Sequence, residues 1–209
     1  MAKQQILSFS EFRDEIRAQL KPLSREQRVA FARRCALHAL PYLYGEGHVD
    51  FWPKKKRLKH IYAVFNLLDF CHAVVILKDY HVDIKKIYVA DAADAAAYAA
   101  YAYADADAYA ADAAAHAARA AERFNQTNIQ PLLRQELQAI INHQAPAKVN
   151  IDGYLLTNFE KALKNQKCDY WAKLYLKVFK DLSSLQATTL AADSFITFNI
   201  LNFENMRAL

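Results

Sequence analysis

Residues 90–121 read ADAADAAAYAAYAYADADAYAADAAAHAARAA, and 21 of these 32 residues are alanine. Alanine has the highest helix propensity of all residues, so this stretch predicts a helix. Asp83 can cap it, and we expect it to continue to about Phe124, a length of roughly 60 Å at about 1.5 Å per residue. Because alanine side chains let neighbouring helices approach closely, we expect this helix to be the centre of the fold.

The other residues of this stretch fall mostly on one side of the expected helix. Projected at about 100° per residue, they occupy an arc roughly 80° wide, at spacings of three and four residues. We expect eight of them to form a partner-binding stripe: Asp91, Asp94, Tyr98, Tyr101, Asp105, Tyr109, Asp112 and His116. Exposed carboxylates attract a basic partner, and tyrosine supplies contact area at low entropic cost. An internal polar seam and a solvated face are the alternatives that stay open.

The rest of the chain also favours helices. Only 3 Gly and 5 Pro occur among the 209 residues, too few for the many tight turns of an all-β fold. Ser8 with Glu11, and Ser24 with Gln27, fit the capping box that begins a helix. Helices are predicted over about 24–42, with Pro41, Gly45 and Gly47 marking the end, over 57–78, and over 126–144 with a proline in its first turn. Residues 154–165 and 169–182 predict an amphipathic pair with Leu155, Phe159, Leu163, Trp171, Leu174, Tyr175 and Val178 facing inward.

These elements predict an all-α fold, a single compact helical domain of about seven to eight helices around the long alanine-rich central helix. We expect this domain to span residues 1–209. The connector APAKVNIDG leaves open a subdivision into a core, 1–145, and a C-terminal helical pair with its tail, 146–209. Residues 194–203 fit either a last helix or a strand, because periodicity alone does not decide between them.

The charge of the chain is unevenly distributed. The net charge is +5, but residues 90–121 hold five Asp and one Arg, a net of −4, which leaves 26 basic and 17 acidic residues elsewhere, a net of +9. Three well-separated cysteines suit a reducing compartment. No secretory hydrophobic region is visible at the N-terminus, and the longest mostly apolar run, 61–77, is too short and polar to span a membrane. We expect a cytoplasmic protein.

The motifs of cofactor-dependent enzymes are missing from the sequence. There is no glycine-rich phosphate loop, no H-E-x-x-H and no paired C-x-x-C. The five Asp of the alanine-rich stretch are spread along one straight helix, so they cannot converge on a cation unless a second helix supplies ligands. We therefore expect no cofactor and no metal site.

One enzymatic alternative rests on Arg33 or Arg34 followed by His38. This spacing resembles the Arg-to-His motif of HEPN-type ribonucleases, an all-α family whose Arg and His act on RNA. The alternative function is thus a ribonuclease or RNA-binding protein that uses these residues. The basic run from Lys54 to Arg57 could bind phosphates, or it could be a solvated helix start. The acidic stripe argues against nucleic acid as the partner of the alanine-rich helix.

Two segments together resemble a known family. SREQRVAFARRCALHALPYL, residues 24–43, and AADAAAYAAYAYADADAYAADAAAHAARAAERFNQ, residues 92–126, look like the alanine-rich, all-α immunity proteins of bacterial polymorphic-toxin systems. The resemblance covers about residues 24–141. It implies a non-enzymatic cytoplasmic protein that binds and neutralises a cognate protein toxin, and it supplies no catalytic residues. The basic loop at 45–56 and the Lys-rich C-terminal helices depart from the family pattern and leave the toxin's identity open.

Overall fold

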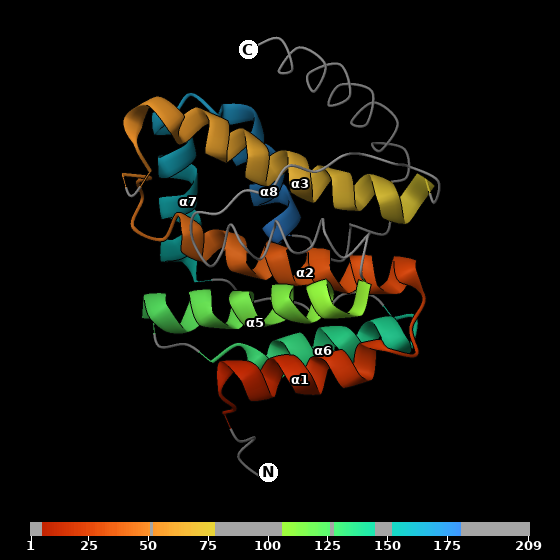
Figure 1. Ribbon diagram of the computed structural model, residues 1–209. Coiled ribbons are helices and arrows are strands. Elements are labelled where there is room, and N and C mark those ends of the chain that lie inside the picture. Colours follow the sequence, from red (N-terminus) through yellow and green to blue (C-terminus); the bar gives the residue numbers. More distant parts are fainter. Residues whose placement is uncertain (1–5, 51, 78–105, 126–127, 145–151, 181–209) are drawn as a thin grey trace.

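The computed structural model describes residues 6–50, 52–77, 106–125, 128–144 and 152–180 (Figure 1). This part of the chain forms seven α-helices and one short 3-10 helix, without a strand, which confirms the all-α prediction for it. The helices are α1 (Phe9–Leu20), α2 (Arg25–Leu43), α3 (Arg57–Leu77), α5 (Ala106–Asn125), α6 (Gln130–Ile141), α7 (Gly153–Asn165) and α8 (Asp169–Lys180), and the 3-10 helix η1 (Lys54–Lys56) leads into α3. Residues 83–105 of the expected alanine-rich helix and the segment 194–203 lie outside the described residues.

Both predicted capping boxes begin helices. The Ser8 hydroxyl accepts the Glu11 N–H at 3.4 Å, and the Glu11 carboxylate accepts the Ser8 N–H at 2.9 Å. Ser24 and Gln27 form the same pair of bonds at 3.3 and 2.9 Å, at the start of α2. These reciprocal bonds satisfy N–H groups that the first turn of a helix leaves without partners.

The end of α2 lies within one residue of the predicted position. Pro41 is in the last turn of α2, the helix ends at Leu43, and Gly45 follows two residues later. Proline removes one N–H from the helical ladder. Close to a helix end, this loss is small beside the packing of the buried side chains around it, since most helical stability in proteins comes from tertiary contacts.

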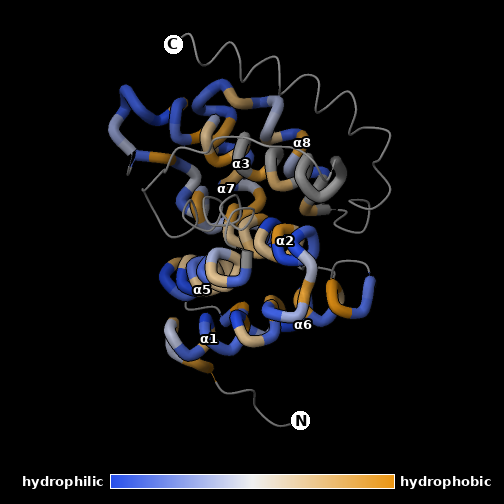
Figure 2. The backbone as a smooth tube through the Cα atoms, turned by 45° about the vertical axis from the view of Figure 1, so that its right-hand side comes forward, coloured by the Kyte–Doolittle hydropathy of each residue, from blue (hydrophilic) through white to orange (hydrophobic). Residues whose placement is uncertain are grey.

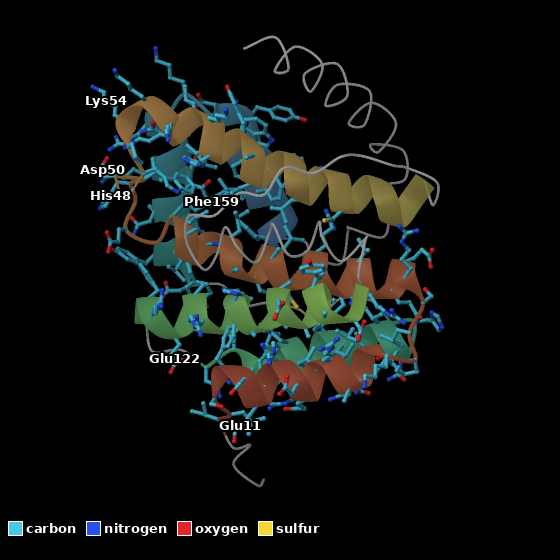
Figure 3. All side chains as sticks on the ribbon, in the orientation of Figure 1. Glu11, His48, Asp50, Lys54, Glu122 and Phe159 are labelled. Carbon is cyan, nitrogen blue, oxygen red and sulfur yellow. The ribbon has the colours of Figure 1, made fainter. Side chains whose placement is uncertain are left out.

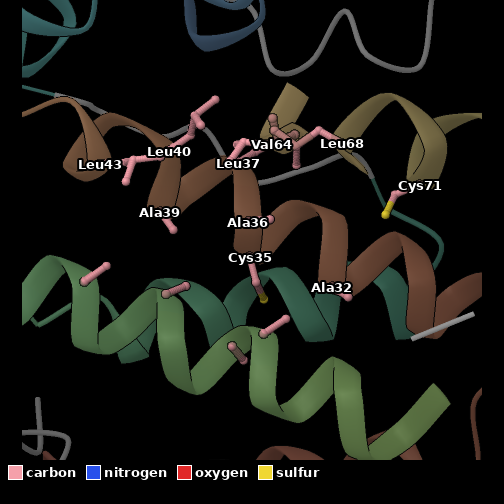
Figure 4. Close-up of a cluster of buried hydrophobic side chains, with 14 of the residues drawn as sticks. Ala32, Cys35, Ala36, Leu37, Ala39, Leu40, Leu43, Val64, Leu68 and Cys71 are labelled. Atoms are coloured by element: carbon pink, nitrogen blue, oxygen red, sulfur yellow. The ribbon is translucent and has the colours of Figure 1, made fainter. Parts of the chain in front are cut away.

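Helix α2 lies between the other helices and presents two different faces to them (Figure 2). Figure 4 shows its small residues Ala32, Cys35 and Ala39 directed toward α5, and the larger Leu37 and Leu40 directed toward α3. All five are buried. The small face allows α5 to approach closely, whereas the leucines fill the wider space below Val64 and Leu68.

The described part of the alanine-rich stretch is helical and lies between α2 on one side and α1 on the other (Figure 1). Its buried alanines are Ala110, Ala111, Ala113, Ala114, Ala115, Ala117, Ala118, Ala120 and Ala121. Alanine burial on two sides agrees with the expectation that helices pack on its methyl faces. Whether the helix extends back toward Asp83 is not described.

Aromatic rings join α3 to the helical pair α7 and α8. The Phe65 ring is stacked between Tyr44 and Trp171, with centroids 6.3 and 5.2 Å away. Phe159 of α7 meets Tyr44 edge-on at 5.4 Å, and Tyr175 of α8 lies 4.8 Å from Phe65. Large aromatic side chains contribute strongly to core stability. The predicted inward positions Leu155, Phe159, Leu163 and Tyr175 are confirmed as buried, Trp171 and Leu174 are half-buried, and the side chain of Val178 is not described.

The turn after α2 is fixed by contacts from two distant helices. The Asn158 amide of α7 donates to the Gly45 carbonyl at 2.5 Å. On the other side, the Phe124 ring of α5 occupies the space that a Cβ atom at Gly45 would need. Gly45 is therefore required by the close approach of an aromatic ring.

We predict that Gly45→Ala lowers the free energy of unfolding by about 1–3 kcal/mol, because the added methyl group collides with the Phe124 ring. Gly153→Ala is the matched control: no atom lies within 4 Å of the position its Cβ would take. It should be neutral or stabilising by up to about 1 kcal/mol, because alanine favours the helix. Urea unfolding measures both. Equal losses for the two variants would contradict the assigned contact.

Candidate functional site

The structure describes three of the eight predicted stripe residues. Tyr109, Asp112 and His116 lie on α5 and are half-buried. The other five, Asp91, Asp94, Tyr98, Tyr101 and Asp105, lie outside the described residues.

Helix α1 covers the described part of the stripe. The His116 ring meets Phe9 edge-on at 5.2 Å, and the Arg119 guanidinium lies over the same ring at 3.8 Å. Two residues before Tyr109, and outside the predicted stripe, Asp107 forms an ion pair with Arg17 of α1 at 3.2 Å. For these residues, the arrangement fits the internal polar seam better than an exposed recognition face.

The pKa of Asp112 is shifted in the direction expected for a carboxyl in such a seam. Burial raises the pKa of its carboxyl above the ordinary value of 3.8, and the nearby Arg13, His116 and Arg17 offset only part of this effect. A solvated surface carboxylate would not lose its hydration in this way. The half-buried charge on Asp112 therefore opposes folding at neutral pH.

We predict that Asp112→Asn raises the melting temperature relative to the wild type at pH 7, and raises it less, or not at all, at pH 3. The folded protein holds the Asp112 proton more tightly than the unfolded chain, so wild-type stability falls as the pH rises from about 3.8 through the raised pKa. Asparagine removes this loss. Glu122→Gln, an exposed acid on the same helix, is the control and should show no such dependence. Thermal melts at the two pH values test this, and equal shifts for both variants would contradict it.

The Arg and His of the ribonuclease alternative lie in a buried charge network. Arg34 Nη1 lies 3.0 Å from Glu136 Oε2, and His38 Nε2 lies 3.0 Å from Glu136 Oε1. The side chains of Glu136, His38 and Arg34 are only 1, 4 and 15% exposed. Arg33 donates from Nε to the Leu68 carbonyl of α3 at 3.3 Å. All three predicted residues therefore face neighbouring helices.

The local sequence explains this geometry. Arg34 and His38 are four residues apart, so they share one face of α2. Glu136 of α6 lies between Leu133 and Leu137 on the buried face of its helix. The prediction from sequence missed Glu136, although a glutamate at a buried position of an amphipathic helix is itself a signal: a buried carboxylate requires partners.

The cysteines do not supply a reactive group. Cys35, Cys71 and Cys168 are all free and buried. Burial, together with the Glu136 charge, raises the pKa of the Cys35 thiol well above its ordinary value. Burial raises the pKa of Cys168 to about 11. Both thiols thus stay protonated at neutral pH, whereas a nucleophilic cysteine needs the thiolate.

We predict that Glu136→Gln lowers the free energy of unfolding by about 3–5 kcal/mol, because it leaves the Arg34 guanidinium without its buried counter-charge. The control is Glu15→Gln, which weakens the more exposed pair between Glu15 and Arg134, with contacts of 2.7 and 2.6 Å. It should lose about 1 kcal/mol or less. Urea unfolding compares the two variants. A smaller loss for Glu136→Gln than for Glu15→Gln would show that the network is not a buried stabilising contact.

A second charged feature lies at the start of α3. Lys54, Lys55, Lys56 and Lys59 are exposed there, and Figure 3 shows Lys54 projecting away from the helices at a corner distant from Glu11. Arg57 lies among them but is engaged: it donates to the Trp52 carbonyl at 3.0 Å and pairs with Asp50 at 2.7 Å. The basic run predicted from sequence is thus a solvated corner with one anchored arginine.

Within the described ranges, no three His, Cys, Asp or Glu side chains are grouped so that they could hold a metal ion. In the same ranges, none of the helices combines the length and apolar character needed to cross a membrane. No protein family, curated protein or solved structure matches this chain. The function is therefore argued from the residues and their contacts.

Proposed function

We propose that this protein is a non-enzymatic, immunity-type protein that binds and neutralises a cognate protein toxin. The observation that carries the proposal is the engagement of Arg34 and His38 by Glu136, with all three side chains largely buried. The residues with ribonuclease-like spacing hold α2 to α6 and do not face solvent, where RNA would have to meet them. The resemblance of residues 24–43 and 92–126 to immunity proteins supplies the functional class.

Two further features support a binding protein. The buried thiols of Cys35 and Cys168 remain protonated, which leaves no nucleophile there. The three free cysteines suit the reducing cytoplasm, where an immunity protein meets its toxin. We also propose that residues 1–209 form one domain around an alanine-rich helix from Asp83 to Phe124, with Asp91, Asp94, Tyr98, Tyr101 and Asp105 on the stretch that precedes α5.

The experiment pairs a neutralisation assay with an RNA cleavage assay. The toxin to test is the C-terminal domain of any large secreted protein whose gene adjoins this one, and growth is measured on co-expression in a bacterial host. We predict that wild-type protein restores growth and leaves purified total RNA intact. His38→Gln should also restore growth, because the glutamine amide can donate to Glu136 although it lacks the titratable ring needed for catalysis.

Two results would contradict the proposal. The first is RNA cleavage by the wild type that His38→Gln abolishes, which would establish the ribonuclease alternative. The second is a failure of folded wild-type protein to restore growth. Circular dichroism of each variant shows whether a lost effect is a loss of the fold.

A further inference from the structure

The exposed start of α3 carries positive charge without local compensation. We call Lys54, Lys55, Lys56, Leu58 and Lys59 the α3 basic face. No carboxylate of the described residues lies within ion-pair distance of its four lysines, whereas the neighbouring Arg57 is paired with Asp50. These lysines therefore point their charge into solvent.

At this position the positive charge of the lysines does not stabilise the folded protein. The N-terminus of a helix is the positive end of its dipole, and acidic residues are favoured there. Helix α3 has no acidic residue in its first turn, and η1 adds three lysines directly before it. The same charge acts on His60: burial, Lys56 and Lys59 all lower its pKa. A sequence that keeps such a repulsive cluster in the folded protein points to an anionic partner.

The α3 basic face also contains one exposed apolar side chain, and residues adjoining the face are held by packing and a hydrogen bond. The Leu58 side chain is 45% exposed between the lysines. At residues adjoining this face, the fully buried Trp52 ring is stacked on His60 with centroids 5.3 Å apart, and the Trp52 carbonyl accepts from Arg57. An exposed leucine surrounded by lysines fits a surface that presents an apolar side chain among carboxylates.

We propose that the α3 basic face binds an acidic segment of a protein partner, with an apolar side chain of that segment against Leu58. This inference rests on the proposed function and adds that the toxin presents an acidic surface to this face. It differs from the sequence-based expectation of a basic partner on the alanine-rich stripe. The negative charge of the stripe and the positive charge of the α3 basic face belong to different parts of the chain.

A protein partner fits the face better than a single-stranded nucleic acid. Binding of single strands relies on open aromatic faces on which bases stack. Near the α3 basic face, the Trp52 ring is buried against His60, and the Trp171 ring of α8 is stacked on Phe65 at 5.2 Å. These two rings already pack against the protein, whereas Tyr170 beside Trp171 is 46% exposed. The residues of the α3 basic face themselves are aliphatic and cationic, and suit carboxylates and an apolar side chain.

The test compares two charge-reversed double variants. Lys55→Glu with Lys59→Glu changes the α3 basic face, and Lys21→Glu with Lys177→Glu makes the same change in net charge at exposed positions of α8 and of the turn after α1. The probe is a fluorescently labelled peptide of repeating Glu-Glu-Leu, and a labelled oligothymidylate is the nucleic-acid comparison. Fluorescence anisotropy at low salt measures both affinities.

We expect the wild type to bind the peptide more tightly than the oligothymidylate. Reversal at Lys55 and Lys59 should weaken peptide binding about tenfold or more, while the control variant changes it little. The same reversal should leave the melting temperature equal to or above that of the wild type, because glutamate suits a helix N-terminus. A melting temperature that is not lowered shows that weaker binding by this variant is not caused by unfolding.

Three results would overturn the inference: no peptide binding by the wild type, tighter binding of the oligothymidylate, or equal weakening by both double variants. The growth assay separates this inference from the proposed function. If the wild type does not neutralise the toxin but its peptide binding depends on Lys55 and Lys59, the proposed function fails and the acidic-segment site stands. If the Lys55/Lys59 variant still neutralises the toxin as well as the wild type, this face is not the toxin site.

Discussion

The buried carboxylate of Glu136 constrains how α2 and α6 can pack. An unpaired ionised carboxylate inside a protein costs several kcal/mol, so α6 must bring Glu136 to a counter-charge and to hydrogen-bond partners. Arg34 supplies the counter-charge at 3.0 Å, and His38 Nε2 lies 3.0 Å from the other carboxylate oxygen. Because α2 also packs on α3, α5 and α7, a contact that fixes its rotation against α6 also fixes which of its side chains face the other helices.

The packing of α5 follows from that orientation. With Arg34 and His38 turned to α6, the small residues Ala32, Cys35 and Ala39 face α5 (Figure 4). A small face against an alanine-rich helix permits close approach of the two backbones, and α1 then covers the remaining polar side of α5. Helix α1 contacts polar residues of α5 at two places, where Phe9 meets His116 and where Arg17 pairs with Asp107.

Much of this arrangement follows from local sequence rules. Capping boxes at Ser8 and Ser24 and the amphipathic pattern of α7 and α8 act within one or two helical turns, and each correctly predicts its element. The alanine-rich stretch correctly predicts a helix over its described part, α5. The contact between Glu136 and Arg34 joins residues 102 positions apart, so no local pattern encodes it. The surroundings of Tyr109, Asp112 and His116 depend in the same way on α1, which is distant in sequence.

These long-range contacts change the interpretation of the residues that the sequence suggested as functional. Arg34 and His38 have a spacing that suggests RNA chemistry, but in the fold both contact Glu136. The lysines at 54–56 and 59 form a solvated corner, and their uncompensated charge is the basis of the proposed acidic-segment site. The central claim is that Arg34 acts through Glu136 as part of the fold. A double-mutant cycle with Arg34→Met, Glu136→Leu and the combined variant, followed by urea unfolding, tests this most directly. We expect each single change to be strongly destabilising and the pair to be non-additive by about 1–3 kcal/mol, with the double variant more stable than the sum of the single losses predicts. Losses that add within about 0.5 kcal/mol would contradict the account.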